Sequence, residues 1–148
     1  MFILIALACD HGGFELMQQV KAHLDENGFE YKDFGTFSEE SCDYPEYAIA
    51  ASQSIKNGEC DLGILICGTG IGMAITANKV PGIRAATCTD TYSAQMSRQH
   101  NNANVLTLGA RVTGLGLALM IVDRFLGTEF EGGRHARRVD MIIALESD

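Results

Sequence analysis

A cysteine followed by three glycines at alternate positions, Cys67-Gly68-Thr69-Gly70-Ile71-Gly72, is the stretch best suited to chemistry. Residues 61–66 before it have the continuous apolar character of a buried parallel strand, and residues 71–78 after it have a helical pattern. The start of such a helix leaves backbone N–H groups free, and with the helix dipole they form a site for an anionic oxygen. Glycine allows the positive φ angles of such a nest, and the same positive helix end would make Cys67 a base or a nucleophile.

The same pattern also fits a tight strand-to-helix turn with a buried structural cysteine, because buried cysteine is common and a lone Gly-x-Gly-x-Gly is a weak signal. Two other ligand classes fit less well. The glycine spacing differs from the Gly-x-Gly-x-x-Gly of dinucleotide sites, and residues 67–74 lack the arginine that a phosphatase loop needs. An oxyanion is the ligand that the loop fits best.

Further candidate residues follow the ends of other predicted elements. Asp10 and His11 come directly after the apolar strand predicted for residues 2–9 and are followed by two glycines. Polar residues at the carboxyl end of a parallel strand are placed like site residues, although a helix N-cap for Asp10 and a loop position for His11 are equally open. Tyr44, at the start of a helix opened by Pro45, fits either a site wall or a packing aromatic.

Three arginines, Arg134, Arg137 and Arg138, stand at the start of the last predicted helix, where cations oppose the helix dipole. Arg134 and Arg138 lie four residues apart and therefore share one face of that helix. Paired guanidinium groups beside free helix amides would clamp a phosphate. Ion pairing with the acidic surface is the alternative interpretation.

The apolar periodicity predicts strands over residues 2–9, 29–34, 61–66, 83–87 and 104–108, and helices over 14–27, 44–57, 71–78, 90–99, 114–126 and 134–145. Strands that alternate with helices indicate one parallel sheet covered on both faces. His11, Cys67, His100 and Arg111 are then expected along one edge of the sheet. A thiol base, an oxyanion nest, two histidines and a phosphate clamp suit proton transfer next to a carbonyl.

Composition excludes several classes of function. The 148 residues are expected to form one domain, and the net charge of −8 argues against nucleic acid or an anionic membrane as partner. Five cysteines without paired spacings indicate reduced thiols in a cytoplasm. No Cys-x-x-Cys or His-x-x-x-His motif points to zinc. The apolar N-terminus lacks the basic region and the cleavage site of a signal peptide, so a buried first strand is expected.

Five blocks of the sequence together resemble the type B ribose-5-phosphate isomerases, which group with galactose-6-phosphate and allose-6-phosphate isomerases. The blocks are Cys9-Asp10-His11-Gly12-Gly13, Asp43-Tyr44-Pro45, Cys67-Gly68-Thr69-Gly70-Ile71-Gly72, Ser97-Arg98-Gln99-His100-Asn101 and Glu131-Gly132-Gly133-Arg134-His135. The resemblance implies a Rossmann-like α/β/α sandwich with strand order 2-1-3-5-4, which the pattern alone does not favour over 2-1-3-4-5. It also implies a homodimer or a dimer of dimers.

The resemblance further implies a cofactor-free and metal-free isomerase that interconverts ribose 5-phosphate and ribulose 5-phosphate in the pentose phosphate pathway. Cys67 would move a proton between C1 and C2, and His100 would open the furanose ring. The other implied site residues are Asp10, Thr69, Asn101 and Tyr44 around the sugar, the amides of Gly68, Gly70, Ile71 and Gly72 on the enediolate oxygen, and His11, Arg134 and Arg138 on the phosphate, with Arg111 nearby.

Two alternatives to the pentose isomerase stay open at this point. A hexose-6-phosphate isomerase of the same family is the nearer one, but galactose-6-phosphate isomerases divide the motifs between two unlike subunits, whereas this chain carries all of them. A nucleotide-binding regulatory module is the other. The resemblance also suggests that the helix at residues 134–145 reaches a partner subunit, so that each site would be built from two chains.

Overall fold

The structure is a computed structural model that describes residues 2–146, so residues 1 and 147–148 of the predicted domain (1–148) lie outside the description. Its elements in chain order are β1 (Leu4–Cys9), α1 (Phe14–Glu26), β2 (Glu30–Asp33), α2 (Tyr44–Lys56), β3 (Leu62–Cys67), α3 (Ile71–Ala77), β4 (Ala85–Thr87), α4 (Thr91–Gln99), β5 (Val105–Gly109), α5 (Leu115–Leu126) and α6 (Arg134–Ala144). The predicted elements are all present, with small shifts at their ends.

The strands form one parallel sheet in the order β2-β1-β3-β5-β4, which confirms the order that the resemblance implied. Strand β5 lies between β3 and β4, since Leu106 is in register with Ile64 on one side and with Ala86 on the other. Strand β4 starts two residues later than predicted. The amide of Arg84 donates to the side chain of Asn104 at 2.8 Å instead of joining the sheet.

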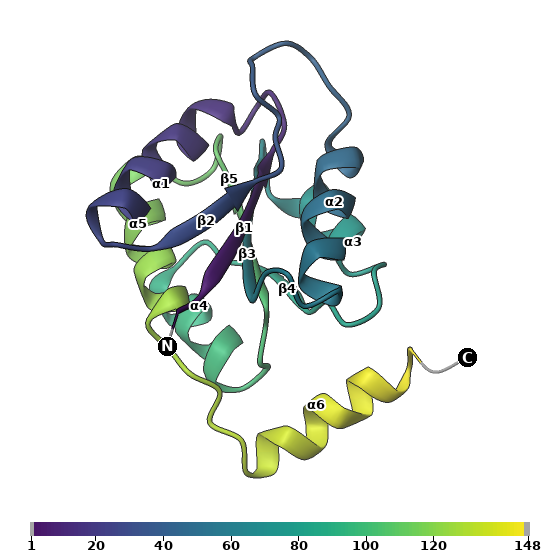
Figure 1. Ribbon diagram of the computed structural model, residues 1–148. Helices are drawn as coiled ribbons and strands as arrows, with labels where there is room; N and C mark the ends of the chain where they lie inside the picture. The colour runs from purple at the N-terminus through teal and green to yellow at the C-terminus, as the bar shows by residue number, and fades with distance from the viewer. Residues whose placement is uncertain (1, 147–148) are drawn as a thin grey trace.

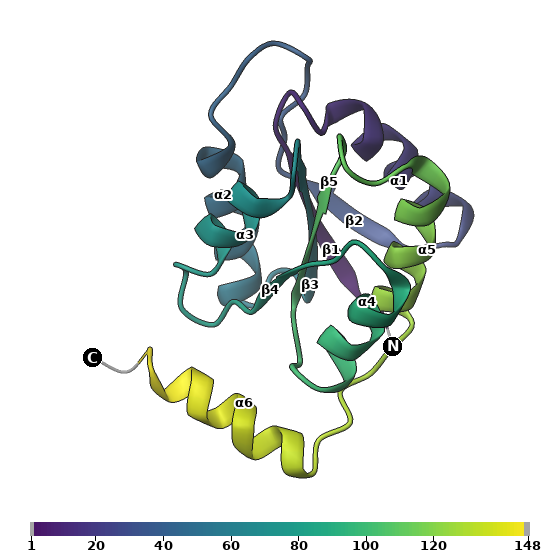
Figure 2. The same cartoon turned by 180° about the vertical axis from the view of Figure 1, so that it is seen from behind.

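Helices cover both faces of the sheet, which gives the predicted three-layer α/β/α sandwich (Figures 1 and 2). On one face, α1 contributes Met17, Val20 and Leu24, whose spacing of three and four residues places them along one apolar stripe. Helices α4 and α5 pack into the same core cluster. On the other face, α2 and α3 contribute small residues and Met73 to a second cluster. Both clusters include residues from the carboxyl ends of β1 and β3.

Helix α6 stands apart from these layers (Figures 1 and 2). Near its start, the ring of His135 stacks on the ring of His100, and just beyond its end the Glu146 carboxylate accepts hydrogen bonds from the Gly82 amide at 2.9 and 3.0 Å. Between these contacts the helix leaves a cleft of about 510 Å³ beside β4.

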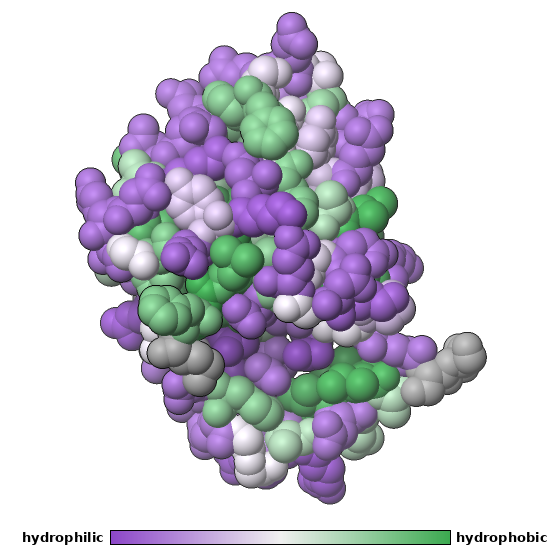
Figure 3. All heavy atoms as spheres, viewed as in Figure 1, coloured by the Kyte–Doolittle hydropathy of each residue, from purple (hydrophilic) through white to green (hydrophobic). Residues whose placement is uncertain are grey.

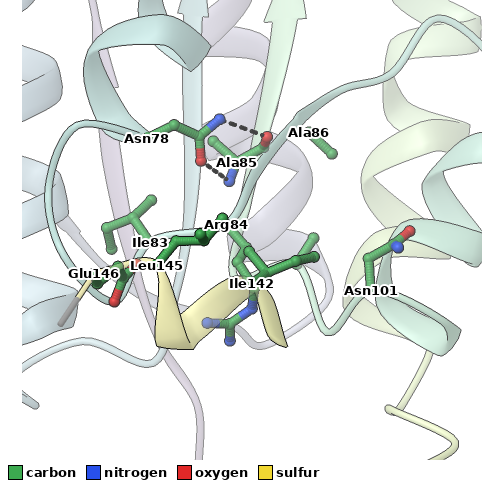
Figure 4. A pocket seen from close by; sticks show the side chains of 10 residues that line it. Asn78, Ile83, Arg84, Ala85, Ala86, Asn101, Ile142, Leu145 and Glu146 are labelled. Carbon is green, nitrogen blue, oxygen red and sulfur yellow. Dashed lines mark hydrogen bonds between the residues drawn. The ribbon is translucent and has the colours of Figure 1, made fainter. Parts of the chain in front are cut away.

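Apolar side chains line the cleft beside α6. Ile142 and Leu145 of the α6 region face Ile83 and Arg84 at the edge of β4 (Figure 4). The space-filling view shows the apolar atoms of α6 gathered toward the hollow between this helix and the body (Figure 3). Helix α6 therefore presents an apolar surface to this cleft, and no other part of the chain within residues 2–146 covers it. Within residues 2–146, no helix is long and apolar enough to cross a membrane.

Gly13 joins β1 to α1 at a point of close approach to β3. A Cβ atom at this position would lie 2.4 Å from the carbonyl oxygen of Ile66, and a backbone group cannot move aside as a side chain can. We expect Gly13→Ala to lower the free energy of unfolding by about 1–3 kcal/mol or more, measured by urea denaturation. Gly116→Ala is the control, because nothing lies within 4 Å of a Cβ there and α5 should gain slightly. Equal stability of both variants would contradict the close approach.

Candidate functional site

Cys67 ends β3 at the carboxyl edge of the sheet and is 5% exposed. Its sulfur accepts a 3.1 Å hydrogen bond from the backbone N–H of Gly70. Gly70 adopts φ +81°, and a Cβ there would lie 2.9 Å from the backbone of Leu108, so only glycine fits this turn. A backbone N–H aimed at the sulfur stabilises negative charge on it. This geometry fits a reactive thiol better than the structural cysteine that was the alternative.

Two other buried cysteines lie in surroundings that keep them protonated. Burial, followed by the nearby Asp33 carboxylate, raises the pKa of the Cys9 thiol to about 12. Burial likewise raises the pKa of Cys88 to about 11. Both thiols are therefore inert at neutral pH. All five cysteines are free, as their unpaired spacing predicted.

Two backbone amides of the loop already donate hydrogen bonds within the loop. The Gly70 amide is directed at the Cys67 sulfur, and the Ile71 amide donates to the hydroxyl of Thr69 at 3.2 Å. The amides of Gly70 and Ile71, which the resemblance placed on the enediolate oxygen, therefore already have partners within the loop. The physical reason is local, since a short loop that begins a helix satisfies its first donors with its own sulfur and hydroxyl.

A cleft of about 390 Å³ opens over this loop. It is lined by Asp10, Tyr44, Cys67, Gly68, Thr69, Ile71, Gly72 and Ile75. The ring of Tyr44 lies so close to Gly72 that a Cβ there would be 2.6 Å from it, so Tyr44 is a wall of the cleft. Asp10 is 7% exposed and accepts a 3.0 Å hydrogen bond from the Gly13 amide. The N-cap of α1 is Gly13 and no side chain caps this helix, so the helix N-cap considered for Asp10 is wrong.

His11 and Arg111 lie next to this cleft. The ring Nδ1 of His11 is 3.2 Å from the Cys42 amide, which donates to it, so a neutral His11 carries its proton on Nε2 and can donate to an anion. The Arg111 amide donates to the Gly68 carbonyl at 3.0 Å. Its guanidinium lies against the same loop, with Nη1 3.7 Å from where a Cβ of Gly68 would be. Both side chains therefore offer donors beside the Cys67 loop.

His100 lies elsewhere, and its expected position on the same sheet edge is wrong. It caps the carboxyl end of α4 and precedes β5, whereas Cys67 is in register with Gly109 at the far end of β5. The helix between β4 and β5 carries the chain back to the amino edge of the sheet. His100 and Cys67 of one chain therefore stand at opposite edges.

A second group of polar residues surrounds His100 at that opposite edge. The rings of His100 and His135 stack with their centroids 4.2 Å apart and their planes 11° apart. Glu131 donates its amide to the Gln99 carbonyl at 3.0 Å and accepts from the Gln99 side-chain amide at 2.9 Å. Asn101 follows His100 and lines the cleft beside α6. These residues form a second polar group that the Cys67 cleft does not include.

Arg134 and Arg138 belong to this second group. They lie in the first turns of α6, beside His135, and both are exposed. Burial, then the neighbouring His100 ring, lowers the pKa of His135, and the charges of both arginines lower it further. The nearby Glu131 carboxylate acts in the opposite direction on the pKa of His135. The two arginines place positive charge at the exposed start of α6, which suits an anionic group.

Several residues of the two groups gave no signal in the sequence. Cys42 contacts His11 across 31 positions, and Ile75 lines the Cys67 cleft. His135 and Glu131 meet His100 only because the chain after α5 turns back under α4. The only sequence signal for Glu131 and His135 was that they lie in one of the five blocks that carry the family resemblance.

The fold and the Cys67 cleft place the chain among the α/β proteins that bind a small ligand at the carboxyl edge of a parallel sheet. A family model described as Ribose/Galactose Isomerase matches residues 5–142. The chain is 56% identical to ribose-5-phosphate isomerase B of Escherichia coli over 142 residues, which are 96% of this chain and 95% of that protein. The chain belongs to the ribose/galactose isomerase family.

Solved structures of the family are closely similar. Ribose-5-phosphate isomerase B of Clostridium thermocellum has a TM-score of 0.96 and 54% identity, and the match covers 97% of each chain. The Mycoplasma genitalium protein with bound ribulose-5-phosphate has a TM-score of 0.93 and 43% identity, with 98% of this chain and 97% of that chain covered. The similarity extends over nearly the whole chain, so it includes the residues of the Cys67 cleft and those around His100.

Proposed function

We propose that the chain interconverts D-ribose 5-phosphate and D-ribulose 5-phosphate. One observation carries this proposal: the sulfur of Cys67 accepts a hydrogen bond from the Gly70 amide in a cleft that Asp10 and Tyr44 also line. Such a thiol is a base beside polar groups that can hold a sugar. The ribulose-5-phosphate-bound relative supports the choice of a pentose phosphate.

Proton transfer would proceed on the open-chain sugar. Cys67 removes the proton from C2, and the electron pair of that bond moves through C1 to the carbonyl oxygen, giving an enediolate. Transfer of the proton on O2 to O1, together with return of the proton from Cys67 to C1, gives the ketose. Loop amides and the Thr69 hydroxyl would stabilise the charged oxygen, and preorganised donors of this kind are each worth about 2.7–4 kcal/mol.

The proposal includes a second copy of the chain. Strand β5, with five residues, separates the two sheet edges by roughly 15 Å, so His100 cannot reach a sugar at Cys67 of its own chain. A two-fold dimer would bring His100, Asn101, Arg134 and Arg138 of one chain to the Cys67 cleft of the other. The unfilled apolar cleft beside α6 supports an association on this side. His11 and Arg111 would complete the phosphate site, and the free thiols suit a cytoplasmic enzyme.

A chain-length series of substrates tests the proposed reaction. Initial rates with ribose 5-phosphate, allose 6-phosphate and galactose 6-phosphate, each coupled to detection of the ketose, should favour the pentose. Faster turnover of a hexose phosphate would assign the second candidate, a hexose-6-phosphate isomerase. Thermal stabilisation by nucleotides and not by sugar phosphates would contradict both.

His100→Asn should separate ring opening from proton transfer. If His100 opens the furanose, the variant can use only the sugar that opens spontaneously. Ketose formation from ribose 5-phosphate should then level off as enzyme is added, whereas consumption of ribulose 5-phosphate, which cannot form a furanose, should stay proportional to enzyme. General acid–base catalysis of this kind raises the rate of the catalysed step ~10²–10⁴-fold. Rates that fall yet remain proportional to enzyme in both directions would place His100 in the proton transfer instead.

A further inference from the structure

We propose that His100, Glu131 and His135 form a binding site for a divalent transition metal of the zinc type, and that occupation of this site blocks the enzyme. One ligand atom from each of the three side chains lies within 4.8 Å of the others. Two imidazoles and a carboxylate are a common ligand set for zinc. The second half of the proposal rests on the proposed role of His100 in ring opening.

The buried imidazole supplies an independent observation. His135 is 6% exposed, and its Nε2 is buried without a hydrogen-bond partner among the described residues. A buried polar nitrogen without a partner is costly in a folded protein. A metal ion is a partner that such a lone pair can bind.

The other two ligands are able to adjust to an ion. In the stack, the two ring planes are nearly parallel, and the nitrogen lone pairs lie in these planes, so one ring must turn before both can point at the same ion. His100 is only half-buried, and none of its ring nitrogens is hydrogen-bonded within residues 2–146, so this ring can turn. Glu131 is exposed, but its Oε2 is oriented by the Gln99 side chain at 2.9 Å, a second-layer contact typical of metal ligands.

Occupation of this site would inhibit rather than assist the reaction. An ion on a ring nitrogen of His100 takes the place of the proton that this ring, as the acid of ring opening, would donate to the sugar. Three protein ligands leave one tetrahedral position for water, so the ion is held without further protein groups. The predicted consequence is reversible inhibition by Zn²⁺ that a chelator relieves.

Cobalt is a suitable probe because Co²⁺ occupies zinc sites and absorbs visible light. Titration of the metal-free protein with Co²⁺ should give one bound ion, without the near-ultraviolet band that a thiolate ligand produces. His135→Gln and Glu131→Gln should each weaken binding by at least about 10-fold. Glu131 is exposed, so this variant cannot fail through loss of core packing.

A matched control is His23→Gln, which removes another histidine that contacts a carboxylate, Asp123 at 2.6 Å. This variant should bind Co²⁺ as the parent protein does, as should Cys67→Ser. Binding that survives both His135→Gln and Glu131→Gln, or that shows a thiolate band, would overturn the site. Binding is read without any assay of turnover, so it decides the site even if the proposed reaction is wrong.

Inhibition is a separate measurement. Zn²⁺ should suppress isomerisation of ribose 5-phosphate by the parent protein, and a chelator should restore it. Relative to its own metal-free rate, Glu131→Gln should need at least about 10-fold more Zn²⁺ for the same suppression. An enzyme that binds Co²⁺ at this site yet keeps full activity in Zn²⁺ would refute the inhibitory role.

Discussion

Cys67→Ser is expected to bind sugar phosphate almost as well as the parent protein and to isomerise it at least about 10²–10⁴-fold more slowly. A serine hydroxyl stays protonated at neutral pH, even with the Gly70 amide 3.1 Å from the position of the sulfur. Binding should survive because the donors of His11 and Arg111 do not depend on the sulfur. Calorimetry measures the affinity, and incorporation of solvent deuterium at C1 or C2 measures the proton transfer.

Cys60→Ser is the matched control for this experiment. Cys60 is also a buried thiol, 2% exposed, but it precedes β3 and so lies at the opposite edge of the sheet from Cys67. Its replacement should leave turnover unchanged. Deuterium exchange that continues at the parent rate in Cys67→Ser would assign the base to another residue.

Mixing two inactive variants should restore activity if each site is built from two chains. Cys67→Ala removes the proposed base, and Arg138→Ala removes a proposed phosphate ligand from the opposite edge. In a mixed dimer, one site carries both substitutions and the other carries neither. Random exchange of subunits makes half of the dimers mixed, so about a quarter of the parent activity should return.

Subunit exchange must be verified, for example by native mass spectrometry of chains that differ in mass. If Cys67 and Arg138 served the same site from one chain, every site would keep one substitution, and mixing would restore nothing. A pair of variants from the same edge, Cys67→Ala with Arg111→Ala, is the internal control. It should show no recovery, because Arg111 lies against the loop of its own Cys67.

The sequence predicted those features that depend on the residue pattern of a single strand or helix. The continuous apolar runs of β1 and β3 indicate strands buried on both faces, and the spacing of Met17, Val20 and Leu24 indicates a helix packed on one side. The place of Cys67 at a strand end followed from the same pattern. The strand order did not, because right-handed crossovers allow both orders, and only the family resemblance chose between them.

The candidate site was harder to predict, because its geometry depends on where the chain reverses. His100 was expected beside Cys67, but the crossover through α4 returns it to the other edge. The contacts of His11 with Cys42, and of His100 with His135, join residues 31 and 35 positions apart. Such pairs are determined by tertiary packing, for which periodicity along the chain gives no signal.

The separation of His100 from Cys67 also has a kinetic consequence. If the two residues meet only across a dimer, a lone chain contains two half-sites and no complete one. Activity should then follow the concentration of pairs, and below the dissociation constant of the dimer the rate should rise with the square of the chain concentration. Dilution would abolish the activity by dissociating the dimer before any chain unfolds. Association of two chains would then be the step that activates catalysis.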